Sequence, residues 1–167
     1  MKQFSAFLLF VISVACLVWA GLAIHLTVQF NMGCSGHLRR AALASAPEIA
    51  TAELDIAVKY LERHAVTNGN TSIFYDAPEN DVSFWYRNLV AAYVNLANTP
   101  EIGSNLEASN KMLKLKEVLI TQVEGNARVN KPNRIAFYPH STLAFITGWL
   151  CVISFGISLF VFCLWRA

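Results

Sequence analysis

The sequence predicts an all-α membrane protein in which two transmembrane helices bracket a small antiparallel helical domain. Two observations predict the membrane helices: residues 4–30 and 141–165 are apolar and contain no Lys, Arg, Asp or Glu. Each stretch is longer than the roughly 20 residues that a helix needs to cross a bilayer. A third observation predicts the domain, because the polar middle of the chain carries three amphipathic helical patterns.

The two apolar runs divide the chain into five parts. Residues 1–3 and 166–167 are short tails, residues 4–30 and 141–165 are the transmembrane helices, and residues 31–140 form the domain. The first run exceeds the roughly 7–15 apolar residues of a signal-peptide core, so we interpret it as an uncleaved anchor. Two membrane crossings place both chain ends on one side and the whole domain on the other.

The side of the membrane that holds the domain follows from loop length rather than from charge. Arg39 and Arg40 follow the first run and three further cations precede the second, whereas the tails carry Lys2 and Arg166. Positive charge near the membrane usually marks the cytoplasmic side, but a loop of about 110 residues translocates largely regardless of charge. We expect an extracytoplasmic domain with both termini cytoplasmic, in a bacterial inner membrane or an equivalent membrane.

Three capping patterns mark helix starts inside the domain: Ser45-Ala46-Pro47-Glu48, Asp76-Ala77-Pro78-Glu79 and Ser104-Asn105-Leu106-Glu107. In each pattern, the cap side chain accepts a hydrogen bond from a free backbone N–H, and the glutamate favours the positive end of the helix dipole. Before them, the polar segment 31–36 contains two glycines. It predicts a break after the first run, followed by a short helix over 37–43.

Apolar residues at three-to-four spacing give each domain helix one face that needs a packing partner. The three helices are expected to end at about Val66, Ala97 and Val123. Short connections predict that they pack as an antiparallel bundle. The expected inward residues are Ile49, Ala52, Ile56, Tyr60 and Leu61 in the first helix, Val82, Trp85, Leu89, Tyr93 and Leu96 in the second, and Leu106, Met112, Leu115, Val118 and Leu119 in the third.

Composition and motifs exclude several function classes. The chain has 13 basic and 11 acidic residues, so it lacks the basic excess of a nucleic-acid-binding protein. Only Cys34 of the four cysteines lies in the domain, so no disulfide can form within it. Met32, Cys34 and His37 are soft ligands, but the paired spacing of a four-ligand metal site is missing. No catalytic or phosphate-binding motif is present, so we expect a non-enzyme with no cofactor and no metal.

Two groups of domain residues are candidates for contacts outside the chain. The consecutive aromatic residues Phe84, Trp85 and Tyr86 point to about three sides of a helix, so one core cannot hold all of them. We expect Trp85 and Tyr86 to contact a partner protein, because aromatic side chains are enriched in interfaces. Arg39 and Arg40 follow the first transmembrane helix and are expected to contact lipid headgroups.

The second transmembrane helix carries a face of small residues. Ala144 and Gly148 are four residues apart, and Gly156 widens the same face. Small residues let two membrane helices approach closely. We therefore expect Ala144, Gly148 and Gly156 to contact another helix, either the first transmembrane helix or one of a partner.

These features favour a non-catalytic accessory or assembly subunit of a larger integral membrane complex. The domain would dock on a partner outside the bilayer, and the transmembrane helices would pack against the partner's helices. One alternative is a homo-oligomeric channel or pore. Another is a ligand-binding sensor that acts through a partner, with a pocket lined by Tyr60, Trp85 and Tyr93. The order of helix, helical domain and helix is similar to the sensing half of bacterial chemoreceptors, but no signalling module follows the second run.

Overall fold

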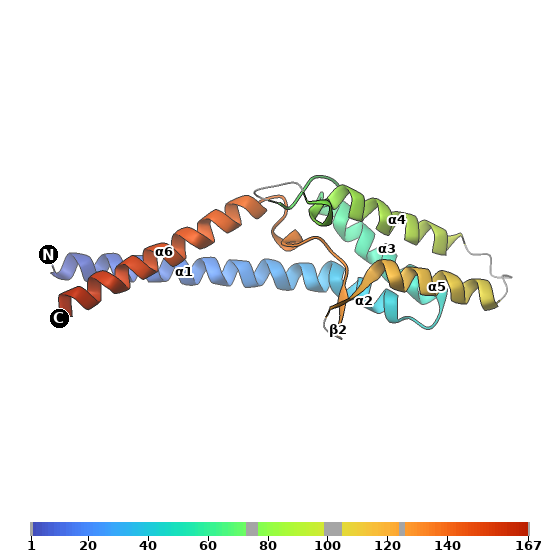
Figure 1. Ribbon diagram of the computed structural model, residues 1–167, viewed down its shortest axis with the longest axis horizontal. Coiled ribbons are helices and arrows are strands. Elements are labelled where there is room, and N and C mark those ends of the chain that lie inside the picture. The colour runs from blue at the N-terminus through green and yellow to red at the C-terminus, as the bar shows by residue number, and fades with distance from the viewer. Residues whose placement is uncertain (1, 73–76, 99–104, 124–125, 167) are drawn as a thin grey trace.

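The computed structural model is an elongated, mostly helical molecule, and it describes residues 2–72, 77–98, 105–123 and 126–166. Two apolar helices form one end and a bundle of four helices forms the other (Figure 1). The helices are α1 (Lys2–Phe30), α2 (Gly36–Leu43), α3 (Pro47–Arg63), α4 (Val82–Ala97), α5 (Asn105–Leu119) and α6 (Ser141–Arg166). The shorter elements are η1 (Asn31–Ser35), η2 (Pro78–Asn80), β1 (Ile120–Val123), β2 (Asn126–Val129) and η3 (Ile135–Phe137).

The first apolar helix continues into the domain without interruption. Phe30 and Gly36 both have right-handed helical backbone angles, and the π-helical turn η1 joins α1 to α2. The predicted break at residues 31–36 is therefore wrong, because a π-helical turn absorbs these polar and glycine residues within one long helix. Among the residues searched, Phe10–Leu43 is the one helix long and apolar enough to cross a membrane, with a mean hydropathy of 2.2.

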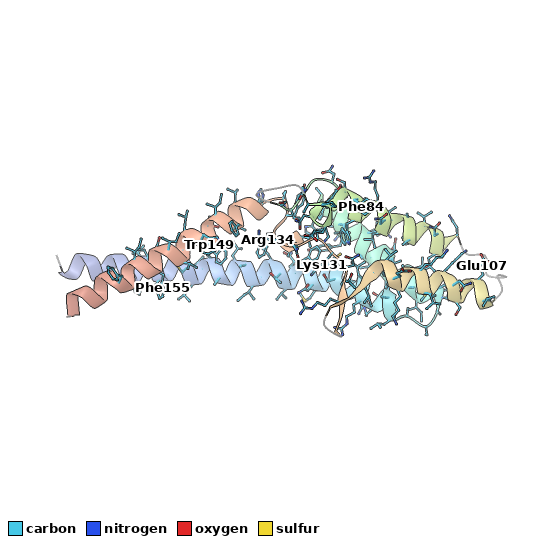
Figure 2. All side chains as sticks on the ribbon, in the orientation of Figure 1. Phe84, Glu107, Lys131, Arg134, Trp149 and Phe155 are labelled. Carbon is cyan, nitrogen blue, oxygen red and sulfur yellow. The ribbon has the colours of Figure 1, made fainter. Side chains whose placement is uncertain are left out.

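The helix α6 is also apolar, but the stretch that could be assessed, Leu143–Ile157, is shorter. It packs along α1, and the two chain ends lie close together at the end of the molecule far from the domain (Figure 1). Figure 2 shows Trp149 and Phe155 on α6, and both side chains are about half exposed.

The helix α3 differs from its sequence prediction at both ends and in its buried face. Ala46 rather than Ser45 occupies the cap position, without a side-chain hydrogen bond. The helix ends at Arg63, and Ala65 adopts a left-handed backbone angle, so the turn comes earlier than the predicted Asn68-Gly69 stop. The buried residues are Ala50, Leu54, Ala57, Val58 and Leu61; of the predicted inward residues, Leu61 is buried, Tyr60 is partly buried, and Ile49, Ala52 and Ile56 are exposed.

The helix α4 confirms its predicted stripe. Val82, Leu89 and Leu96 are buried, and Trp85 and Tyr93 pack against the same core. The helix begins at Val82 rather than Pro78, because η2 forms a separate turn and Asp81 caps the helix by accepting a hydrogen bond from Phe84 N (3.0 Å). The predicted cap Asp76 lies outside the described residues, as does Ser104, the predicted cap of the third helix.

The chain is not entirely α-helical. The third domain helix, α5, ends at Leu119 instead of about Val123, and β1 pairs with β2 in an antiparallel hairpin, with Ile120 opposite Val129. The β-branched residues of β1 favour an extended strand over a helix. Leu115 and Leu119 are buried as predicted and Met112 is partly buried, whereas Leu106 and Val118 are exposed.

The four domain helices close around one hydrophobic core. The α2 helix contacts α3 and α5, and α4 contacts the other sides of α3 and α5. The α2 helix is the member of this bundle that sequence analysis treated only as a short extension of the first run. The largest fully buried apolar side chains are Leu38, Leu54, Leu61, Leu89, Leu119 and Ile135.

Candidate docking groove

A groove of about 900 Å³ runs between α4 and α5 and ends at the β-hairpin. Its α4 wall contains residues one helical turn apart, from Phe84 through Asn88 and Ala92 to Asn95. Its α5 wall contains Leu115 and Val118 among others. The groove therefore follows the two helix faces for about three turns, which is a shape that can accept a third helix.

Basic side chains gather on one side of this groove. Lys111 and Lys114 come from α5, and Arg128 and Lys131 come from the hairpin and the segment after it. Glu107 pairs with Lys111 at 3.1 Å. The carboxylates in the lining, Glu79 and Asp81, lie beside the start of α4, where Asp81 caps the helix. The groove thus combines an apolar α4 wall with a positively charged α5 and hairpin side.

The predicted contact residue Trp85 lines the groove but is also part of the domain's own structure. Its indole Nε1–H donates to the backbone oxygen of Asn130 at 2.7 Å, and its ring packs against the hydrophobic core. Its neighbour Phe84 is 57% exposed and lines the same groove. Sequence reasoning noted Phe84 but did not select it, because the exposed member of three consecutive aromatic residues depends on where the helix begins.

The second predicted contact residue, Tyr86, faces α3 rather than the groove. Its hydroxyl donates to Glu62 Oε1 at 3.0 Å, and the ring is partly buried against the core. Burial and the hydrogen bond to Glu62 raise the pKa of Tyr86. Neither residue's contact with a partner is tested by a single chain, so both remain predictions.

Lys131 connects the groove to the first apolar helix. Its Nζ donates to Ser35 Oγ at 3.0 Å and to Asn31 Oδ1 at 3.3 Å, and it lies 5.1 Å from the centre of the Phe30 ring. Burial lowers the pKa of Lys131. Figure 2 shows Lys131 where the long helix enters the domain. One lysine therefore lines the groove and binds two polar residues of the π-helical turn.

The π-helical turn is tightly packed against α3. Cys34 is fully buried, and burial raises the pKa of its thiol to about 12. Gly33 lies against the ring of Tyr60, which leaves no room for a side chain at that position. Met32, by contrast, is 68% exposed. Cys34 and Met32 therefore occupy different environments, and the described residues hold no cluster of three His, Cys, Asp or Glu side chains placed for a metal ion.

The predicted headgroup residues Arg39 and Arg40 lie on α2. The Arg40 Nη2 donates to Glu53 Oε2 at 3.0 Å, and Nδ1 of His37 donates to the same oxygen at 2.6 Å. Burial alone would raise the pKa of Glu53, but these two hydrogen bonds outweigh it and lower the pKa. Arg39 is exposed. Their contact with lipid stays a prediction.

The small residues of α6 occupy two different environments. Gly148 is buried against α1, and a Cβ at this position would lie 2.7 Å from Cζ2 of Trp19. Beside it, Trp19 Nε1 donates to Thr147 Oγ1 at 2.9 Å. Gly156 is exposed with no neighbouring atom within 4 Å, and Ala144 is partly buried. Gly148 therefore packs inside the chain, and Gly156 is open to a second helix.

The three aromatic residues of the predicted sensor pocket do not line one groove. Trp85 lines the groove, while Tyr93 donates to Asp55 on α3 and Tyr60 packs edge-to-face against Phe30.

Comparison of the chain with family models, with curated proteins and with solved structures finds no match. Its function must therefore be inferred from its own geometry.

Proposed function

We propose that the chain is a membrane-anchored, non-catalytic assembly subunit of a larger integral membrane complex. In this proposal α1 and α6 cross the membrane, the four-helix domain lies on the extracytoplasmic side, and both termini are cytoplasmic. The observation that carries the proposal is the open groove between α4 and α5, with its apolar wall and basic side. A groove of this kind on a helical domain is suited to docking a helix of another subunit.

The exposure of the apolar helices supports their insertion in a bilayer. Leu17 and Val18 on α1 are 70% and 67% exposed, and Leu150 and Val152 on α6 are 57% and 63% exposed. An exposed apolar surface of this extent is unfavourable in water and favourable among lipid chains. With a rise of 1.5 Å per residue, each helix is long enough to cross a hydrocarbon core of about 30 Å.

The contacts between the two helices support an antiparallel pair with a matched register. Cys16 Sγ lies 3.5 Å from the backbone oxygen of Cys151, and three residues further along α1 Trp19 reaches Thr147. Extending this register places Ile24 level with Leu143. The polar residues that follow on α1, beginning with His25, are then level with the start of α6, at one membrane surface.

Two surfaces remain for other subunits in this arrangement. In the domain, the groove exposes Phe84 to solvent. In the membrane, the open side of Gly156 lets a second helix approach closely. An assembly subunit with contacts both in and above the bilayer uses both surfaces at once.

The test is purification of the full-length chain from its native membranes in mild detergent, with identification of the proteins that remain bound. We expect at least one larger integral membrane protein in fixed stoichiometry. Ala91→Trp fills the groove and should reduce this association, because Ala91 is exposed in its lining. The matched control is Arg87→Trp, which lies on the same helix outside the groove. Isolation of the chain without any companion would contradict the proposal.

A further inference from the structure

The outer face of α3 carries an apolar row that no element of the described chain covers. Ile49 and Ile56 are 53% and 45% exposed, and Ala52 between them is also exposed. Their spacing of three and four residues places them on one side of the helix. Two isoleucines on the outside of a small bundle form a surface that a partner would stabilise by covering it.

An acidic row runs beside these apolar residues. Glu48, Asp55 and Glu62 are seven residues apart, and this spacing returns to nearly the same side of a helix after two turns. Asp55 pairs with Lys59 at 2.7 Å, whereas Glu48 and Glu62 are exposed. The outer face of α3 thus has an apolar row and an acidic row, as the groove has an apolar wall and a basic side.

The two surfaces also lie at the same height in the domain. Tyr93 of α4 donates to Asp55 Oδ1 at 3.3 Å, and Tyr86 of α4 donates to Glu62 Oε1 at 3.0 Å. These bonds place the acidic row level with the part of α4 that forms the groove wall. Two copies anchored in one membrane would therefore present the face of one and the groove of the other at matching heights.

We propose that α3 of a second copy of this chain occupies the groove. Ile49, Ala52 and Ile56 would pack against the α4 wall, and the acidic row would face Lys111 and Lys114. The inference rests on the proposed docking role of the groove and names its occupant. Because the two contacting surfaces differ, the association is head-to-tail, and in a membrane it produces a ring or a row of subunits.

Cross-linking between two differently tagged copies tests this contact directly. Ile56→Cys in one copy and Asn88→Cys in the other should form an intermolecular disulfide in membranes, because Asn88 lines the groove. Replacing Asn88→Cys by Arg87→Cys on the same helix should reduce the cross-link at least about tenfold. Equal cross-linking at both positions would overturn the proposal.

Charge reversal supplies a second test that does not depend on one contact. Lys111→Glu with Lys114→Glu should weaken self-association of the full chain in nanodiscs about tenfold or more. Adding Glu48→Lys and Glu62→Lys to the same chain should restore it, while circular dichroism and thermal unfolding report that every variant remains folded. Failure of the folded four-residue variant to reassemble would overturn the proposal.

The outcomes for the two proposals are separable. A larger companion lost on Ala91→Trp, without any cross-link between copies, would leave the docking role in place and reject the second copy as occupant. A cross-link between copies in the absence of any companion would support the second copy and reject the role in a larger complex. A groove that cross-links only to anionic lipid would reject both.

Discussion

The domain and the pair of apolar helices are stabilised in opposite ways. In the domain, large apolar side chains such as Leu54 and Leu89 are at most 1% exposed, and they share one continuous core. In the pair, side chains of the same type, such as Leu17 and Leu150, are more than half exposed. The domain therefore contains the apolar environment that it needs, whereas α1 and α6 must obtain theirs from outside the chain.

The two regions meet through polar and aromatic groups rather than through either core. Lys131 binds the π-helical turn, Arg134 lies 4.6 Å from the centre of the Phe145 ring of α6, and Tyr138 donates to the backbone oxygen of Asn68 at 2.6 Å. Figure 2 shows Arg134 between the domain and α6. This junction lets an apolar pair and a water-exposed bundle share one continuous helix.

The largest expected effect comes from removing a leucine in each region. Leu54→Ala should destabilise the domain by about 3 kcal/mol, because Leu54 is fully buried and its loss leaves a cavity. Leu22→Ala on α1, where the leucine is 56% exposed, should leave domain unfolding unchanged. Denaturant unfolding of both variants in nanodiscs, followed by circular dichroism, measures the difference. Similar losses of unfolding free energy would show that the two regions are not independently stabilised.

Two glycine substitutions sharpen the comparison inside the apolar pair. Gly148→Leu should separate α1 from α6 at a cost of about 2 kcal/mol, because the new side chain overlaps the Trp19 ring. Gly156→Leu should leave the pair intact, since the space beside Gly156 is open. The readout is oxidative cross-linking of the native Cys16 to Cys151, which lie next to each other in the pair. Equal cross-linking yields in the two variants would show that Gly148 does not set the contact.

The helices α3 and α4 show how far sequence reasoning reaches in the domain. The α4 stripe was predicted correctly, because its largest side chains all lie on one face. The α3 face was predicted wrongly, because Ile49 and Ile56 were assigned to the core in preference to Ala50 and Ala57. Alanine marks close helix packing poorly in a hydrophobicity pattern, since the same small residue is common on exposed helix surfaces.

Local chemistry also failed where tertiary contacts decide the backbone. The polar segment around Gly33 reads as a break, but Tyr60 packs against that glycine and Lys131 binds Asn31 and Ser35. These partners are 27 to 100 residues distant along the chain, so no local pattern reveals them. The groove was missed for the same reason, because its walls belong to separate helices whose relative placement the sequence does not specify.

A smaller effect tests the role of Trp85 in the domain. Trp85→Phe should lower the unfolding free energy by roughly 1.5 kcal/mol, because the Asn130 backbone oxygen loses its donor at 2.7 Å. Phe84→Leu on the same helix should have little effect on unfolding, since Phe84 is 57% exposed. Both changes alter the groove, so co-purification of partners measures docking while denaturant unfolding measures stability. An unchanged unfolding curve for Trp85→Phe would assign Trp85 to docking alone.

The smallest effect concerns the ion-paired carboxylate on the surface of the domain. The Glu53 pKa is lowered in the folded state, because the hydrogen bonds from His37 and Arg40 outweigh burial. The stabilisation is therefore present above the unfolded pKa of about 4.3 and is lost as the pH falls through the lower folded value. Glu53→Gln should cost about 1 kcal/mol of unfolding free energy at pH 7 and almost nothing near pH 3.

Thermal unfolding between pH 3 and pH 7 measures this difference, with Glu117→Gln as the control on an exposed carboxylate of α5. The apolar pair lies outside this pH dependence, because residues 4–30 and 141–165 contain no carboxylate. If Glu53→Gln shifts the unfolding temperature equally at both pH values, its effect arises from packing rather than charge. The pH-dependent part of the stability would then have to come from other carboxylates of the domain.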